Sequence, residues 1–332
     1  MPRINVKEKL FSTIAFVFVF LVIFSLLGEK KVLAFNREDM VHFALRTPPF
    51  GFGNFVFALS RWDRKKTTTS TTTTTTPPST TTPPVSTNTN NLFAGITSLT
   101  LNEANTSSNS TNPIFLLGSG GLFFVANEVA YTIQKELPST NVWYKDYAVS
   151  NPIDTDGGKH PQNIFRLMTK SFFTNNEQSL YFNISAMNLS SSPNRNASNG
   201  VLFMSRYQDA QNLYYAGIRV DGTVVIKKKK AGTYYTMAQT KILPGIYNRD
   251  TSPNLLPLNT WMGIKLVTTN VKSQVLLTFY VDDGKGAGFV KVLEALDDGT
   301  TYGGSAFSQA GVLGLRTDFM DVFFKNYIAQ SK

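Results

Sequence analysis

Tyrosine, arginine and aspartate side chains gather in two neighbouring stretches, residues 204–209 and 212–219. Aromatic rings stack on the apolar faces of sugar rings, and arginine, aspartate and asparagine side chains bond to sugar hydroxyls. A run of four lysines at residues 227–230 follows, and two tyrosines come shortly after it. These residue types predict a carbohydrate-binding site composed of Arg206, Tyr207, Asp209, Tyr214, Tyr215, Arg219, Lys228 and Tyr235.

Two-residue alternation decides which of these side chains can share a surface. In a strand, Tyr214 lies on the face opposite Tyr215 and Arg219, so burial of one set leaves the other exposed. The lysine run divides between the two faces in the same way. Lysines on an open face attract acidic glycans, whereas lysines on a sheet edge discourage aggregation. Packing of the tyrosines in a core is the alternative to a sugar site.

The elements that must position these side chains are strands. Short apolar and aromatic runs alternate with clusters of glycine, asparagine, aspartate and proline from about residue 113 onward. Asp221-Gly222 stands between two such runs and predicts a hairpin, because its turn requires positive φ. We expect strands at residues 122–125, 164–168, 180–184, 201–207, 214–220, 223–229, 261–268, 274–281, 312–316 and 322–328.

Three segments carry a recognisable pattern. Residues 212–227 read NLYYAGIRVDGTVVIK, residues 259–267 read NTWMGIKLV, and residues 311–327 contain GVLGLRTD followed by DVFFKNY. In order and spacing they resemble the concanavalin A-like lectin/glucanase superfamily, and within it the laminin G-like and 3-keto-disaccharide-hydrolase-type domains. The resemblance implies an all-β fold, a two-sheet jelly-roll sandwich over residues 113–332, that binds a polysaccharide or surface glycan.

The same resemblance suggests two further features. Related domains often hold one structural Ca²⁺ through oxygen ligands, and Asp321 is the residue that loosely matches such a position. Gly311 and Gly314 are expected to let neighbouring strands approach closely, because a glycine has no side chain to keep them apart.

Catalysis is the main alternative to binding. Glycosidases of this superfamily carry paired carboxylates in a Glu-x-Asp-x-x-Glu pattern, and hydrolysis with retention needs two carboxylates about 5 Å apart. None of the glutamates beyond residue 112 lies in that pattern. Residues 244–248 are faintly similar to an alginate-lyase signature, but Leu243 replaces its lysine. We expect binding without catalysis, with a glycoside hydrolase or lyase and a structural cell-envelope protein as alternatives.

The first 112 residues differ in composition from the rest. Residues 10–27 form an 18-residue run without a charge, long enough to span a hydrocarbon core. Residues 1–34 therefore serve as a transmembrane anchor or as a signal peptide cleaved near Ala34. Residues 35–66 are an irregular or amphipathic spacer. Residues 67–112 are rich in threonine, serine, proline and asparagine, which predicts a disordered stalk.

Charge and modification motifs agree with an exported chain. Residues 1–66 carry 11 of the lysines and arginines and 5 of the acids, so much of the basic excess lies beside the membrane segment. The remainder is only mildly basic, which gives no signal for nucleic acid. The chain has no cysteine, and disulfides and thiolate metal sites are excluded. Glycosylation sequons occur at Asn105, Asn109, Asn183, Asn188 and Asn196.

Overall fold

A computed structural model describes residues 91–332, which fold into two stacked antiparallel β-sheets. The predicted anchor or signal segment, the spacer and the threonine-rich tract up to residue 90 lie outside the described residues. Between residues 91 and 332, no helix has both the length and the apolar character needed to cross a membrane. The all-β, two-sheet architecture expected from the sequence is confirmed.

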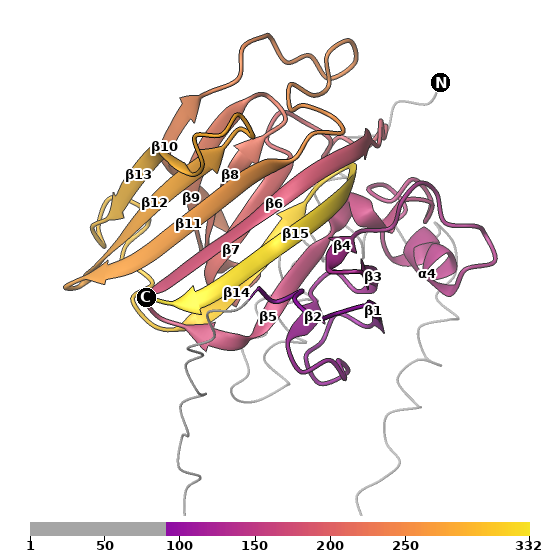
Figure 1. The fold of residues 1–332 in the computed structure, drawn as a ribbon, viewed down its shortest axis with the longest axis horizontal. Coiled ribbons are helices and arrows are strands. Elements are labelled where there is room, and N and C mark those ends of the chain that lie inside the picture. Colours follow the sequence, from indigo (N-terminus) through magenta and orange to yellow (C-terminus); the bar gives the residue numbers. More distant parts are fainter. Residues whose placement is uncertain (1–90) are drawn as a thin grey trace, which may run out of the picture. The chain divides into compact units, whose positions relative to one another are not determined.

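One sheet has eight strands and the other has seven, and Figure 1 shows β6, β11 and β15 in front of β7, β8 and β9. The eight-stranded sheet runs in the order β1 (Ser98–Glu103), β3 (Gly121–Ala126), β4 (Val129–Tyr131), β15 (Met320–Ser331), β6 (Asn176–Met187), β11 (Met262–Val271), β12 (Gln274–Asp282) and β13 (Val290–Asp297). The seven-stranded sheet runs in the order β10 (Thr233–Lys241), β9 (Thr223–Lys230), β8 (Asn212–Arg219), β7 (Gly200–Asp209), β14 (Gly311–Thr317), β5 (Arg166–Phe173) and β2 (Phe115–Leu117). A short helix α4 (Val142–Ser150) and a 3₁₀ turn η2 (Pro161–Ile164) complete the domain.

Alternating burial explains why these sequences form a sandwich. Along β3 every second residue is fully or nearly fully buried, and the same period recurs in β6 and β12. The inward side chains of both sheets interdigitate in one apolar core that includes Phe182, Phe203, Phe279 and Phe324. The predicted Asp221-Gly222 hairpin joins β8 to β9, and Gly222 has a φ of 78° there. Only glycine adopts this conformation without strain.

The sandwich begins earlier than the sequence indicates. Residues 91–112 were expected in the disordered stalk, but β1 pairs with β3 along its whole length. Asn91 forms a β-bridge with Ile328 of β15, and Phe93 is fully buried between aromatic rings that include Phe115 and Tyr327. The sequence did not predict this strand because few apolar side chains mark it within a polar segment. Its stability comes instead from its pairing with β3.

Two glycines allow close contact between strands, as expected. A Cβ at Gly314 would lie 2.6 Å from the Met204 Cε and 2.8 Å from the Leu167 carbonyl oxygen. A Cβ at Gly311 would lie 2.6 Å from the Arg206 carbonyl carbon. Strand β14 can therefore lie between β5 and β7 only because it carries no side chain at these two positions.

Candidate functional site

The face of the seven-stranded sheet that points away from the core carries its own cluster of apolar and aromatic side chains. Buried Met168, Met204, Leu213 and Tyr215 pack together there, with Tyr207 and Val312 against them. Tyr234 of the edge strand β10 stacks on Tyr215, with ring centroids 6.0 Å apart and an interplanar angle of 28°. We call this surface, with Tyr207, Tyr215 and Tyr234 as its rings, the tyrosine face.

Strand register explains how the tyrosine face is assembled. Tyr215 of β8 lies directly opposite Met204 on one side and Lys227 on the other. Tyr234 lies opposite Lys229, and the Lys229 Nζ is 4.8 Å from the centroid of the Tyr234 ring. A lysine above an aromatic ring gains cation–π attraction and covers part of the ring. Tyr234 nonetheless keeps 49% of its surface exposed.

Two arginines lie side by side on the same face. Arg166 of β5 is directly opposite Arg316 of β14. The Arg316 guanidinium carbon is 5.6 Å from the centroid of the Tyr215 ring, and its Nε donates to the Asp318 Oδ1 at 2.8 Å. The Arg166 Nε is buried and has no hydrogen-bond partner within the described residues. One of the two guanidinium groups is thus paired with a carboxylate, and the other is not.

Further cations surround the tyrosines. Burial lowers the pKa of Lys227, and the charges of Arg219 and Arg316 lower it further while Asp221 opposes them. Arg219 itself is paired with Asp221, with 2.6 Å between the Arg219 Nη2 and the carboxylate oxygen. Burial also raises the pKa of the Tyr215 hydroxyl. The face therefore combines the exposed ring of Tyr234 and the half-buried ring of Tyr207 with positive charge.

The structure brings together only part of the predicted sugar site. Tyr207, Tyr215 and Arg219 do lie on the outer side of the seven-stranded sheet. Asp209 is exposed at the β7–β8 turn, where its carboxylate accepts from the Gln211 backbone N–H and the Asn212 side chain. It stabilises the turn, and its charge adds to burial in raising the pKa of the neighbouring Tyr207 hydroxyl.

Arg206 is not on the surface, contrary to the prediction. The β7–β8 register shifts between Ser205 and Asp209, and Arg206 adopts a φ of 50° at this bulge. The bulge reverses the alternation, so the side chain turns inward and donates to the carbonyl oxygens of Phe307 and Gln309 and to the Asn270 side chain. Burial lowers the pKa of the Arg206 guanidinium to about 10.

Tyr214 and Lys228 are also buried rather than exposed. Both contact the same carboxylate oxygen of Asp297, Tyr214 through its hydroxyl at 2.5 Å and Lys228 through its Nζ at 2.7 Å. The Lys228 Nζ also donates to the Gly304 carbonyl, and the Phe307 N–H donates to the Tyr214 hydroxyl. These residues, together with Arg206, anchor the loop between β13 and β14.

Tyr235 packs against the loop between β13 and β14. It lies directly opposite Lys228 in the β9–β10 pairing and so faces the same side of the sheet, away from Tyr234. A Cβ at Gly303 would be 2.6 Å from the Tyr235 ring, which shows how closely the loop covers it. The predicted site included Tyr235 and not Tyr234, but Tyr234 is the one that lies on the tyrosine face.

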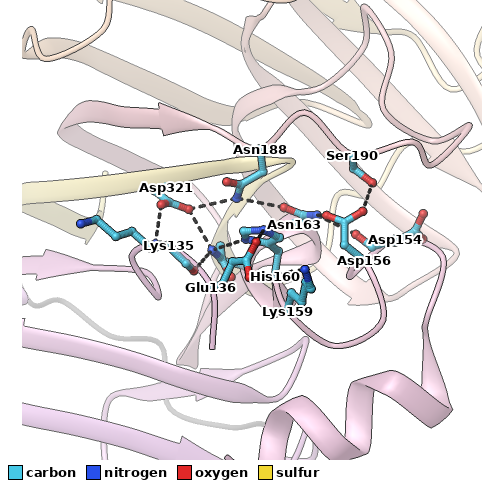
Figure 2. A network of polar contacts seen from close by, with 11 residues as sticks. Lys135, Glu136, Asp154, Asp156, Lys159, His160, Asn163, Asn188, Ser190 and Asp321 are labelled. Carbon is cyan, nitrogen blue, oxygen red and sulfur yellow. Dashed lines mark hydrogen bonds and ion pairs between the residues drawn. The ribbon is translucent and has the colours of Figure 1, made fainter. Parts of the chain in front are cut away.

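Asp321 belongs to a network of polar side chains that Figure 2 shows from close by. Asp321 is 2% exposed, and its carboxylate accepts from the Lys135 backbone N–H, the Gln162 amide and the Asn188 amide at 2.7, 2.8 and 3.0 Å. N–H groups aimed at both carboxylate oxygens repel a cation, so these surroundings do not fit Ca²⁺ at Asp321. No group of three or more acidic, histidine or cysteine residues between residues 91 and 332 is arranged to hold a metal ion.

The rest of this network fastens loops to one another. Asn188 also donates to the Asn163 side chain, and Asn163 donates to Asp156, which accepts from Ser190 as well (Figure 2). His160 lies 3.7 Å from Glu136 at the margin of the network. The contacts are those of a structural cluster.

The five sequons differ in accessibility. Asn105, Asn109 and Asn196 are exposed, and Asn183 is half-buried on β6. Asn188 is buried, and its side-chain nitrogen donates two hydrogen bonds within the Asp321 network. A glycan on that nitrogen would break the network, so the prediction of glycosylation at Asn188 does not fit the folded domain.

Comparison with known proteins gives a likeness of fold only. No protein-family profile matches the sequence, and no curated protein matches it. Among solved structures, the chain is similar to a carbohydrate-binding module, CBM66, from Bacillus subtilis, with 19% identity, coverage of 51% of this chain and 83% of that chain, and a TM-score of 0.35. It is also similar to winged bean acidic lectin in complex with methyl-α-D-galactose, with 8% identity, coverage of 69% and 98%, and a TM-score of 0.36. Likenesses this distant transfer neither a ligand nor an activity to this chain.

Proposed function

We propose that this protein binds carbohydrate through the tyrosine face. The observation that carries the proposal is the stacked pair Tyr215 and Tyr234, with Arg316 beside the Tyr215 ring. A sugar ring offers apolar C–H groups to an aromatic surface and hydroxyls to neighbouring polar side chains. The tyrosine face offers both, on a sheet whose strands hold the rings in fixed positions.

Binding fits this face better than hydrolysis. Of the carboxylates beside the tyrosines, Asp318 and Asp221 are each bonded to an arginine, and Asp209 accepts from the Gln211 backbone N–H and the Asn212 side chain. A glycosidase needs one carboxylate as proton donor and a second as nucleophile or base. Two carboxylates held by guanidinium groups stabilise the arginines and are poorly suited to either role.

The proposal includes display of the domain to an external glycan. Residues 1–34 would direct export or attach the chain to a membrane, and the threonine-rich tract would hold the sandwich away from that surface. The ligand would then be a polysaccharide or a glycan of a neighbouring surface. Both statements rest on the amino-acid sequence of residues 1–90.

A glycan array probed with the full chain tests the proposed function. Tyr234→Ala removes the exposed ring of the pair and should weaken binding to any array ligand by about tenfold. Tyr280→Ala is the matched control, because Tyr280 also lies under a lysine, with the Lys265 Nζ 4.5 Å from its centroid, but on the other sheet. Equal binding by both variants would place the site elsewhere, and absence of any glycan binding would refute the proposed function. Release of a shortened product from a bound glycan would favour the enzyme instead.

A further inference from the structure

Arg166 and Arg316 form a like-charged pair across neighbouring strands. They are directly opposite in the β5–β14 register and point to the same side of the sheet. Like charges in this position oppose sheet formation. Asp318 compensates Arg316 through the Nε–Oδ1 hydrogen bond of 2.8 Å. The charge of Arg166 has no such compensation among the described residues.

Arg166 is half-buried, and its hydrogen bonding differs from that of the other arginines whose Nε atom is buried without a partner. Arg206 and Arg249 leave their Nε atoms unpaired as well, but both donate to backbone carbonyls through their Nη atoms. The Arg166 side chain makes no hydrogen bond or ion pair with any residue in the described part of the chain. A buried donor without a partner is costly, and in Arg166 that donor is the Nε–H. This cost is explained if the partner is an external anion.

Lys227 supplies a second unpaired charge on the same face. It lies directly opposite Tyr215 on β9 and forms no ion pair within residues 91–332. Burial lowers its pKa, and the charges of Arg219 and Arg316 lower it further against the opposing charge of Asp221. An anion bound beside Lys227 would reverse this effect.

The two unpaired cations are far apart on the sheet. Four strand spacings separate Arg166 on β5 from Lys227 on β9, which corresponds to about 19 Å between the strands. The Tyr215 ring and the Arg316 guanidinium lie between them. A single sugar ring cannot reach both cations, whereas a chain of several sugars lying across the strands can.

We propose that the ligand of the tyrosine face is an acidic polysaccharide, whose carboxylate or sulfate groups pair with Arg166 and Lys227 while its rings stack on the tyrosines. The inference rests on the proposed function and adds the ligand class. A guanidinium group binds a carboxylate or sulfate through two parallel N–H donors. Arg166 is therefore the residue that distinguishes an acidic chain from a neutral one.

The test is a binding titration of the full chain with three probes of similar length: a galacturonic acid oligomer, a sulfated dextran oligomer and a neutral galactose oligomer. We expect at least one of the two acidic oligomers to bind about tenfold more tightly than the neutral one. Arg166→Gln should abolish that preference, so that the acidic and the neutral oligomers bind with similar affinity. Lys145→Gln, which removes an exposed charge from α4, is the control and should keep the preference.

The outcomes separate this inference from the proposed function. Equal affinity for acidic and neutral oligomers, or a preference that survives Arg166→Gln, would overturn the acidic ligand while leaving carbohydrate binding intact. Absence of binding by all three probes and by the array would overturn both. A stronger response to galacturonate identifies the carboxylate, and one to dextran sulfate identifies the sulfate. Thermal unfolding provides the folding check, because removing one of two opposed arginines should leave the midpoint unchanged or raise it.

Discussion

Lys228 and Asp297 form an ion pair in which neither side chain has any exposed surface, with 2.7 Å between the Lys228 Nζ and the Asp297 Oδ2. Removing one partner leaves the other charge buried and uncompensated. We therefore expect Asp297→Asn to lower the free energy of unfolding by about 3–5 kcal/mol. Denaturant unfolding followed by tryptophan fluorescence measures this change.

A surface ion pair of the same length serves as the control. Lys291 and Glu294 are also 2.7 Å apart, but both side chains are about half exposed. Glu294→Gln should change the free energy of unfolding by no more than about 1 kcal/mol, since water solvates the remaining charge. Equal losses for Asp297→Asn and Glu294→Gln would show that burial of the Lys228–Asp297 pair has no energetic consequence.

Alkaline pH should destabilise the domain through its buried tyrosines. Burial, with a smaller effect of Asp146, raises the pKa of Tyr147 from 10.0 to about 12. Between these values the unfolded chain releases the phenolic proton and the folded chain retains it, so stability falls as pH rises. Tyr147 alone contributes a loss of about 2–3 kcal/mol across this range. Burial shifts the pKa of Tyr214 and Tyr327 in the same direction.

The variant Tyr147→Phe isolates this contribution. It removes the ionisable hydroxyl and its hydrogen bond to the Ser119 carbonyl, so the variant starts less stable at neutral pH but loses less stability above pH 10. Denaturation curves collected at a series of pH values provide the comparison. Parallel pH dependence in the two proteins would contradict the assigned role of Tyr147.

The exposure of each asparagine, and not the presence of a sequon alone, should decide which sites are glycosylated. In a host that attaches N-glycans, we expect the exposed Asn105, Asn109 and Asn196 to be modified and Asn188 to remain unmodified in the folded protein, because its amide bonds to Asp321 and Asn163. Glycopeptide mass spectrometry of the secreted, folded fraction decides this. A fully occupied Asn188 in that fraction would show that the polar network of Figure 2 can open.

Local patterns were sufficient to predict most of the long strands. The alternation that separates Tyr214 from Tyr215 and Arg219 is present in the structure, because β8 is regular throughout. The Asp221-Gly222 turn also formed where expected, since its requirement for positive φ is a property of two residues. The short strand β1 was missed because its stability comes from pairing with β3.

The candidate site was less predictable, for two physical reasons. Arg206 lies at a bulge, and the extra residue there reverses the inside–outside assignment of the residues that follow it on the strand. Arg166 and Arg316 are distant in sequence and meet only through the β5–β14 register. Alternation within one strand predicts the face on which each residue lies. It does not predict which residue lies opposite on the neighbouring strand.

The bridge between Asn91 and Ile328 determines how the domain responds to tension. Asn91 and the buried Phe93 are fastened to β15, which lies inside the eight-stranded sheet between β4 and β6. A pull transmitted along the chain from its N-terminal side therefore loads an interior strand before it reaches the edge strand β1. Interior strands are hydrogen-bonded on both sides, so this attachment resists mechanical unravelling of the domain from its N-terminal end.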